Sequence, residues 1–141
     1  MLRRIFPVSL IALFLVWTAA ANATIRAHID ISDQRLDLYV DGEKTESWAV
    51  STGLRSGWTP TGKFQPYWLH RHHRSSLFSG APMPYSVFFS GHYAIHGTNQ
   101  LKQLGSPASH GCVRLDPKNA AVLFNLILAH SKKATVIEIT H

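Results

Sequence analysis

Apolar and polar residues alternate in two segments that follow residue 23 of the chain. The apolar positions are Ile25, Ala27, Ile29 and Ile31 in the first segment, and Leu36, Leu38 and Val40 in the second. A period of two residues is typical of a strand with one buried face. Asp41-Gly42 then predicts a tight hairpin turn before a third strand at about residues 45–51. The N-terminal third is therefore predicted to be a β-meander.

The middle of the chain predicts two loops around short strands. Residues 52–62 and 97–111 contain several Gly and Pro residues, which favour loops. Between them, residues 85–89 and 92–95 are predicted to be short strands joined by Ser90-Gly91. The two loops are thus expected to flank a small β scaffold.

One helix is predicted near the C-terminus. Asp116 is a suitable N-cap, Pro117 suits the first helical position, and residues 120–129 are rich in Ala, Leu, Phe and Ile. Because apolar residues cover most of its circumference, we expect this helix to be largely buried, and about 13 residues are too few to span a membrane. A last strand is predicted at residues 134–140.

The first 23 residues have the pattern of a secretory signal peptide. Arg3 and Arg4 precede an uncharged run at residues 5–17, and small residues follow as far as Ala23. A bilayer span needs about 20 apolar residues, so a cleaved signal peptide is favoured over a permanent anchor. We expect cleavage after Ala23, which leaves residues 24–141 as a single exported domain.

The charge balance is basic. The chain has 14 Lys and Arg residues against 8 Asp and Glu, a net charge of +6 with His neutral. Both Arg3 and Arg4 lie in the predicted signal peptide, so the net charge of the remainder is +4. A basic surface favours an anionic partner, but no run of Lys or Arg with interleaved aromatics predicts a nucleic-acid groove. Cell-wall polymers and lipid head groups are better candidates.

The single cysteine, Cys112, lies in the segment Ser109-His110-Gly111-Cys112-Val113-Arg114. Exported proteins usually pair or avoid cysteines, so an unpaired one indicates a buried small hydrophobe, an intermolecular disulfide or a nucleophile. A nearby imidazole can take the thiol proton, and Cys with His is the minimum for covalent acyl transfer. Both His96 and His110 are candidate partners.

Two glycines next to the candidate catalytic residues have predicted roles. Gly111 removes a side chain where a substrate backbone must approach, and the amides of Gly111 and Cys112 could form an oxyanion hole. Gly97, directly after His96, allows close packing. Because His96 precedes Cys112 in the chain, a papain-like peptidase, whose Cys comes well before its His, is disfavoured.

At these residues the chain resembles the L,D-transpeptidases of bacterial cell walls, the YkuD domain family. The resemblance rests on His96-Gly97-Thr98 followed at the family's spacing by Ser109-His110-Gly111-Cys112. It extends to Ser51-Thr52-Gly53 and residues 59–64, and covers practically all of residues 24–141. It implies a mainly β fold, a compact sandwich or barrel-like domain with one short helix packed on it.

The resemblance also implies the chemistry. In the family the cysteine attacks the peptide bond after the third residue of a peptidoglycan tetrapeptide stem, releasing D-Ala and forming a thioester. An amine of a neighbouring stem then gives a 3-to-3 cross-link, an amine of a wall-anchored protein gives attachment, and water gives a carboxypeptidase. No cofactor is implied, and carbapenems are the expected covalent inhibitors.

Residue roles follow from the same resemblance. Cys112 is the nucleophile and His96 the general base, with the backbone carbonyl of Gly97 orienting the imidazole in place of a carboxylate. The resemblance implies that His110 organises the site by hydrogen bonding. Ser109 and Gly111 are assigned to the loop that binds substrate or the oxyanion.

Two further positions each have more than one interpretation. Many family members have Asn two residues after the cysteine, whereas this chain has Arg114. We hypothesise that Arg114 pairs with a carboxylate of the stem peptide, such as that of diaminopimelate, and a structural salt bridge or helix-end contact is the alternative. Tyr85 lies where the family often has an aromatic beside the donor site, so it is predicted either to line the pocket or help hold the oxyanion, or to lie in the core.

Residues 65–84 have no clean period and predict either a lid over the site or an ordinary surface excursion. Five basic residues are adjacent there: His70, Arg71, His72, His73 and Arg74. Imidazoles are common zinc ligands, but the arginines would repel a cation and no His-Glu-x-x-His pattern is present. We therefore expect no metal site.

The interpretation that combines these observations is a periplasmic L,D-transpeptidase acting on peptidoglycan stems. An L,D-carboxypeptidase or endopeptidase with the same Cys-His site is the nearest alternative, because the sequence does not say whether an amine or water reaches the thioester. A catalytically silent wall-binding module is an alternative of another class. The presence of both Cys112 and His96 favours the enzyme.

Overall fold

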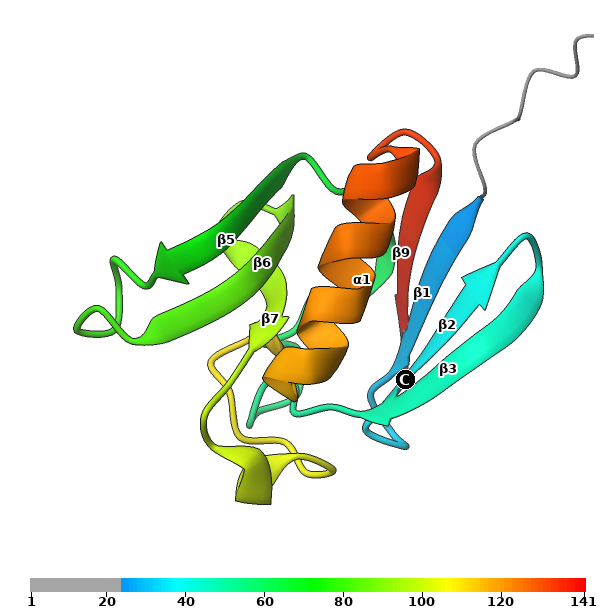
Figure 1. Cartoon of the computed structure of the whole chain (residues 1–141). Coiled ribbons are helices and arrows are strands. Elements are labelled where there is room, and N and C mark those ends of the chain that lie inside the picture. The colour runs from blue at the N-terminus through cyan, green and yellow to red at the C-terminus, as the bar shows by residue number, and fades with distance from the viewer. Residues whose placement is uncertain (1–23) are drawn as a thin grey trace, which may run out of the picture.

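A computed structural model describes residues 24–141, so the predicted signal peptide at residues 1–23 lies outside the described residues (Figure 1). The described chain folds into two mixed β-sheets and one α-helix, which confirms the mainly β fold class. Within these residues, no helix combines the length and apolar character that crossing a membrane requires.

The first sheet contains the predicted meander. Its strands lie in the order β3-β2-β1-β9-β4. Their bounds are β1 (Ile25–Asp30), β2 (Arg35–Val40), β3 (Glu43–Ala49), β4 (Gly62–Phe64) and β9 (Thr135–Thr140). Asp41 and Gly42 have φ of 50° and 82°, as the hairpin turn requires. The third strand begins two residues earlier than predicted, and β9 pairs parallel with β1.

The second sheet holds the strands on either side of the loop that contains Cys112. Its order is β5-β6-β7-β8, with β5 (Trp68–Arg74), β6 (Pro82–Ser90), β7 (Tyr93–Gly97) and β8 (Val113–Leu115). The parallel pairing of β8 with β7 sets Arg114 opposite His96. Cys112 therefore ends the loop that leads into β8.

Two of these strands were not predicted. Residues 65–84 are mostly the hairpin of β5 and β6, whose histidines and arginines hide any alternation of apolar and polar positions. β8 has only three residues, and it lies within a motif in which no strand was predicted. Both strands form because they pair with a neighbour: β5 is hydrogen-bonded to β6 and β8 to β7.

The helix α1 (Pro117–His130) begins as predicted, because the Asp116 carboxylate accepts a hydrogen bond from the Lys118 amide at 2.9 Å. It lies between the two sheets (Figure 1). Four residues on one face are buried: Ala120, Leu123, Phe124 and Ile127. The prediction that the helix is largely buried is wrong, since Val122 and Leu128 are 46% and 57% exposed.

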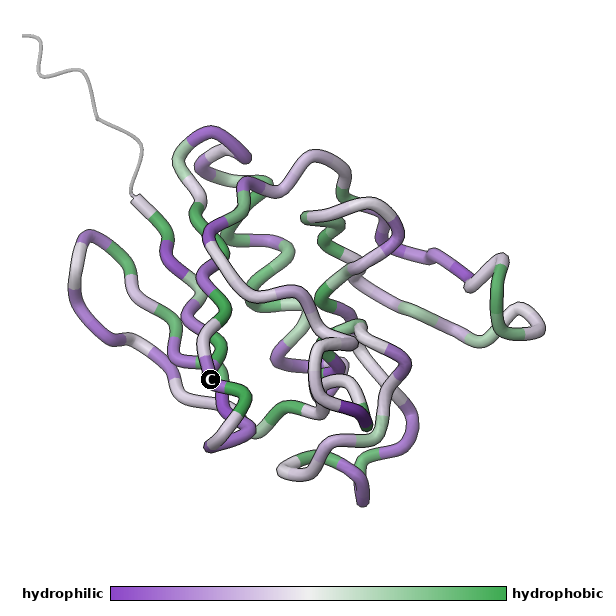
Figure 2. The backbone as a smooth tube through the Cα atoms, turned by 180° about the vertical axis from the view of Figure 1, so that it is seen from behind, coloured by the Kyte–Doolittle hydropathy of each residue, from purple (hydrophilic) through white to green (hydrophobic). Residues whose placement is uncertain are grey.

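A single large apolar cluster joins the sheets and the helix. It includes the alternating residues of β1 and β2, together with Ile137 and Ile139 of β9 and Leu123 of α1. Figure 2 shows the alternation of hydropathy along these strands. This core fixes the second sheet and hence the loops that carry the motif residues.

Candidate active site

The two loops that carry the motifs are bonded to each other. The Ser109 amide donates to the Thr52 carbonyl at 2.9 Å. The Thr59 hydroxyl donates to the Gly111 carbonyl at 2.9 Å and accepts from the Gly53 amide at 2.8 Å. Loop 52–62 therefore supports the loop between β7 and β8, which contains Cys112 and is called the nucleophile loop below.

Packing in the structure requires glycine at position 111. Its φ is +130°, and a Cβ there would lie 2.4 Å from Cε1 of Tyr93 and 2.6 Å from the Trp58 carbonyl oxygen. Packing is thus a sufficient reason for the glycine, and the explanation that it leaves room for a substrate backbone stays a prediction. At Gly97, a Cβ would lie 3.0 Å from Cα of Pro117, which agrees with the predicted close packing.

Ser109 shapes the nucleophile loop from inside. The residue is 1% exposed, and its hydroxyl donates to the Cys112 carbonyl at 2.6 Å while accepting from the Gly111 amide at 3.0 Å. Because the Gly111 amide is engaged, the Cys112 amide is the one of the predicted pair that remains as a candidate oxyanion donor.

His96 is a buried imidazole with a lowered pKa. The residue is 6% exposed, and its Nδ1 lies 2.7 Å from the Gly97 carbonyl oxygen. A carbonyl only accepts, so Nδ1 carries the proton and Nε2 keeps its lone pair. Burial lowers the pKa of His96 to about 4, against the opposing effect of the Gly97 bond, and the charge of Arg114 lowers it further.

Cys112 is a partly buried thiol. Its Sγ lies 3.8 Å from the His92 carbonyl oxygen, which accepts from it. Burial raises the pKa of the Cys112 thiol, whereas a hydrogen bond with the Ala94 backbone and the charge of Arg114 lower it. Thiol and imidazole are therefore both neutral near pH 7, and the proton must leave sulfur as attack proceeds.

His110 is held by aromatic stacking. Its ring lies between Trp58, at 5.6 Å and an interplanar angle of 15°, and Phe78, at 4.5 Å and 22°. The resemblance implied a hydrogen-bonding role for this residue, but these two stacking contacts are what the structure shows. Because Trp58 belongs to loop 52–62 and Phe78 to the β5–β6 turn, the stack ties both segments to the nucleophile loop.

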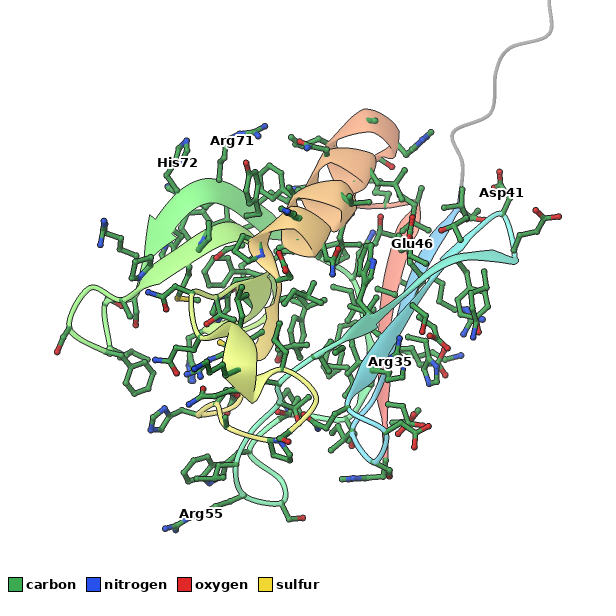
Figure 3. The ribbon with its side chains drawn as sticks, turned by 60° about the horizontal axis from the view of Figure 1, so that its bottom comes forward. Arg35, Asp41, Glu46, Arg55, Arg71 and His72 are labelled. Atoms are coloured by element: carbon green, nitrogen blue, oxygen red, sulfur yellow. The ribbon has the colours of Figure 1, made fainter. Side chains whose placement is uncertain are left out.

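A pocket of about 550 Å³ gathers most of the predicted site residues. Five of them line it: His96, Ser109, His110, Cys112 and Arg114. The turn between β5 and β6 borders the pocket through Leu77 and Phe78. A lid was one of the two interpretations of residues 65–84, and in the structure both strands of this hairpin contribute residues to the pocket in addition to the turn. On β5 itself, Arg71 and His72 point outwards (Figure 3).

Tyr85 does not line this pocket. Its ring packs edge-on against Phe124 of α1 with centroids 5.7 Å apart, and the Arg71 guanidinium lies 5.6 Å from the Tyr85 centroid. Tyr85 is thus placed on the core side of β6, which was the alternative. Met83, two residues earlier, lines the pocket instead.

One pocket wall was missed by the sequence analysis. Trp68 stacks on Phe88 at 4.8 Å and 24°, and His73 packs edge-on against Phe88 at 5.0 Å. All three residues line the pocket. The aromatic content of residues 67–73 was the available signal, but without a predicted strand it could not be assigned to one face.

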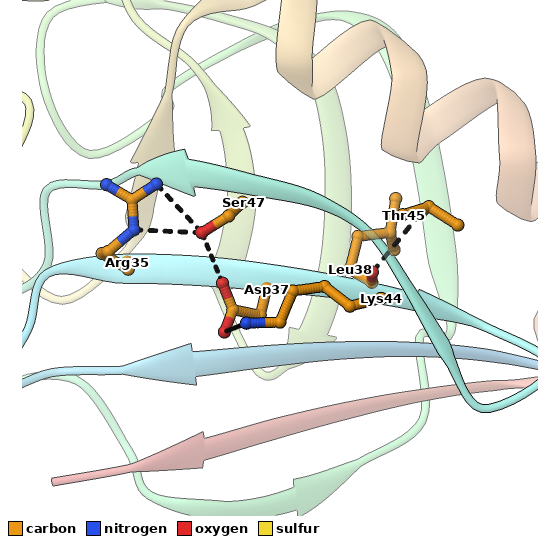
Figure 4. A network of polar contacts seen from close by, with 6 residues as sticks. All are labelled: Arg35, Asp37, Leu38, Lys44, Thr45 and Ser47. Atoms are coloured by element: carbon orange, nitrogen blue, oxygen red, sulfur yellow. Dashed lines mark hydrogen bonds and ion pairs between the residues drawn. The ribbon is translucent and has the colours of Figure 1, made fainter.

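Arg114 enters the pocket without a carboxylate partner among residues 24–141. Its Nη1 donates to the Gln103 side-chain oxygen at 3.2 Å. The ion pairs of the described residues are Arg26–Glu138 and Lys44–Asp37, both on the first sheet (Figure 4 shows the latter). The alternative of a structural salt bridge for Arg114 therefore finds no support within this part of the chain.

Known proteins share this sequence and fold. The family model of the L,D-transpeptidase catalytic domain, YkuD, matches residues 24–139. The putative L,D-transpeptidase YkuD of Bacillus subtilis is 31% identical over 107 residues, which cover 74% of this chain and 62% of that protein. The probable L,D-transpeptidase YbiS of Escherichia coli is 34% identical over 83 residues, which cover 50% of this chain and 24% of that protein.

A solved structure shows the same fold. L,D-transpeptidase LdtMt1 in complex with imipenem superposes with a TM-score of 0.73 at 22% identity, over 84% of this chain and 59% of that chain. The chain spans less than two thirds of each of these three relatives. The family match over nearly all described residues shows that the chain belongs to the YkuD family of L,D-transpeptidase catalytic domains.

Proposed function

We propose that this domain is a peptidoglycan L,D-transpeptidase in which Cys112 is the nucleophile and His96 the general base. The observation that carries the proposal is the pairing of a buried neutral imidazole, fixed through Gly97, with the only cysteine of the chain in one pocket. Family membership supports the reaction class.

In the first half-reaction, Sγ of Cys112 attacks the carbonyl carbon of the third residue of the stem, and the thiol proton passes to Nε2 of His96. The Cys112 amide donates to the developing oxyanion. The carbon–nitrogen bond then breaks, the amine of D-Ala takes the proton from His96, and a thioester remains on Cys112.

In the second half-reaction, an acceptor amine attacks the thioester and loses a proton to His96. The carbon–sulfur bond then breaks, and His96 returns this proton to the departing sulfur, which restores the thiol and the neutral imidazole. We propose a second stem peptide as this acceptor, with a wall-anchored protein as the other amine donor. Arg114 supports recognition of a stem carboxylate, because its guanidinium is half-buried and bonded only to a neutral amide within the described chain.

The proposal includes the location and an inhibitor class. The predicted signal peptide supports export to the periplasm, where the stem peptides are. Carbapenems are proposed as covalent inhibitors of Cys112, supported by the family's LdtMt1, which has been solved with imipenem.

The test is product analysis by liquid chromatography and mass spectrometry after incubation with disaccharide-tetrapeptide, with Cys112→Ala as the control. Cross-linked dimers formed by the wild type alone would support the transpeptidase. Tripeptide as the sole product would indicate the carboxypeptidase instead, and cleavage of pre-formed dimers would indicate an endopeptidase. No product with either protein would contradict the enzymatic proposal.

A further inference from the structure

The charges of the chain are unevenly distributed along the sequence. Residues 24–49 and 134–141, which form most of the first sheet, contain three Lys and Arg and seven Asp and Glu. Residues 50–133, which form the second sheet, both motif loops and α1, contain nine Lys and Arg and a single acid, Asp116. That acid is engaged as the N-cap of α1. The half of the molecule that carries the pocket is therefore strongly cationic.

Two of these cations stand beside the pocket mouth. The guanidinium of Arg55 lies 5.2 Å from the ring of Trp58, which stacks on the pocket residue His110. Arg74 donates from Nη1 to the Gly80 carbonyl at 3.1 Å, and so lies at the base of the β5–β6 turn that borders the pocket. Both side chains are on exposed residues.

A third cation lies close in sequence to a partner of a pocket residue. Lys102 is exposed in the 3-10 helix η1 (Leu101–Gln103), directly before Gln103, which accepts a hydrogen bond from Arg114. We refer to Arg55, Arg74 and Lys102 as the cationic rim. The rim approaches the pocket from loop 52–62, from the β5–β6 turn and from η1.

No carboxylate balances the rim within residues 24–141. None of the 22 residues that line the pocket is Asp or Glu, and no rim residue belongs to an ion pair of the described chain. Figure 3 shows Arg55 at the opposite end of the molecule from Asp41 and Glu46. A cluster of exposed cations without neighbouring carboxylates produces a positive potential that attracts anions.

We propose that the cationic rim binds carboxylate-bearing stem peptides that flank the stem being processed on the same wall polymer. This rests on the proposed function, since it extends that site to the surrounding polymer. The rim residues lie on three segments that also contain or contact pocket-lining residues, so a flat anionic lipid surface bound to all three would also cover the pocket. A flexible polymer can contact the same cations through its flanking stems while another of its stems occupies the pocket.

The attraction is expected to be collective and sensitive to salt. A single exposed charge contributes little, but several around one opening raise the local concentration and encounter rate of an anionic polymer. At physiological ionic strength the Debye length is about 8 Å, so added salt screens these contacts.

The test is co-sedimentation of the full-length mature protein with purified insoluble peptidoglycan, in a Cys112→Ala background so that no turnover occurs. The rim variant carries Arg55→Gln, Arg74→Gln and Lys102→Gln. The matched control carries Arg35→Gln, Lys63→Gln and Lys133→Gln, which remove the same charge from exposed positions outside the pocket. Thermal unfolding of both variants checks that each is folded.

We expect binding at low salt to weaken roughly tenfold in the rim variant and by less than about twofold in the control. Binding by the protein with an unsubstituted rim should weaken steeply with added salt, and also when the polymer's free carboxylates are amidated. Equal losses in the two variants, a salt-independent wild type, or equal binding to amidated polymer would overturn the proposal. So would binding to anionic lipid vesicles without binding to peptidoglycan.

Failure of the rim proposal can be told apart from failure of the proposed function. Acylation of Cys112 by soluble disaccharide-tetrapeptide tests the chemistry without any flanking stem. An acylated wild type whose polymer binding ignores the rim would retain the transpeptidase and reject the rim, whereas a rim-dependent binder that is never acylated would reject the transpeptidase.

Discussion

The two halves of the molecule treat their polar groups in opposite ways. On the first sheet, polar side chains are paired: Ser47 donates to Asp37, accepts from Arg35, and Lys44 bonds the other Asp37 oxygen at 2.8 Å (Figure 4). This pairing lowers the pKa of Asp37, because both hydrogen bonds favour the carboxylate. The charges of Arg35, Asp37 and Lys44 are thus each satisfied by a neighbouring side chain.

Around the pocket, polar groups are left with unused capacity. His96 is buried with one ring nitrogen unengaged, Arg114 has no carboxylate partner in the described chain, and Gly111 adopts a φ that favours glycine. Such arrangements cost stability, and folds retain them where ligands or reacting atoms complete them. The difference indicates that the first sheet stabilises the fold and that the second holds groups ready for chemistry.

The largest effect is expected from substitution of His96, the proposed base. We expect His96→Ala to reduce acylation of Cys112 by roughly 10³-fold or more, because general base catalysis is lost. His110→Ala should leave a measurable remainder, since His110 is held by stacking and the proposed base is His96. Acylation rates from rapid-quench mass spectrometry decide this, and equal residual rates would show that the base is misassigned.

Gly111 and Gly42 give a matched pair for stability. Both have positive φ, but a Cβ at Gly42 meets nothing within 4 Å, whereas one at Gly111 collides with Tyr93 and the Trp58 carbonyl. We expect Gly42→Ala to cost about 1 kcal/mol of unfolding free energy and Gly111→Ala about 3 kcal/mol or more, with loss of acylation. Denaturant unfolding measures both, and equal costs would contradict the packing argument.

The buried base also predicts a pH dependence of stability. The pKa of His96 is about 4 in the folded protein and 6.5 for an ordinary histidine, so the unfolded chain binds the proton first. Stability from this group is complete above pH 6.5 and falls as the pH drops towards 4, by about 1.4 kcal/mol per unit. Unfolding of wild type and His96→Gln over this window tests it. An unchanged slope in the variant would assign the dependence to other groups.

Arg114 tests whether the unpaired charge of the pocket recognises substrate. We expect Arg114→Lys to raise KM about tenfold and to change kcat less, because lysine keeps the charge but loses the planar fork that fits a carboxylate. Steady-state kinetics with stems whose carboxylates are free or amidated measure this. The effect should shrink with the amidated stem, and an unchanged KM with the free stem would count against carboxylate recognition.

The smallest effect is expected on the first sheet. Asp37→Asn removes the carboxylate that Lys44 and Ser47 share, at an exposed surface far from the motif loops. We expect the melting temperature to fall by no more than about 4 °C and acylation to remain at the wild-type rate. A large loss of acylation would show that the two halves are coupled, which would break the comparison.

Local patterns were enough to predict the elements whose determinants are neighbours in sequence. The meander of β1 to β3 follows from alternation and the Asp41-Gly42 turn, and α1 follows from the Asp116 cap and Pro117. β5 and β8 could not be predicted in this way. Their residues lack alternation or are too few, so strand pairing decides their conformation.

The site shows the same limit. The motif identified Cys112 and His96, and the structure places both at one pocket together with Arg114. Sequence could not show which face of β6 carries Tyr85, because side-chain direction depends on the register of the whole sheet. Nor could it show that His110 is stacked between rings from two segments that are distant in sequence.

The most direct test of the central claim is time-resolved intact-mass spectrometry of the mature protein with disaccharide-tetrapeptide. The account predicts an adduct of the substrate mass less D-Ala on the wild type, located at Cys112 by peptide mapping, and none on Cys112→Ala. Turnover without an adduct that depends on Cys112, or an adduct on another residue, would contradict it.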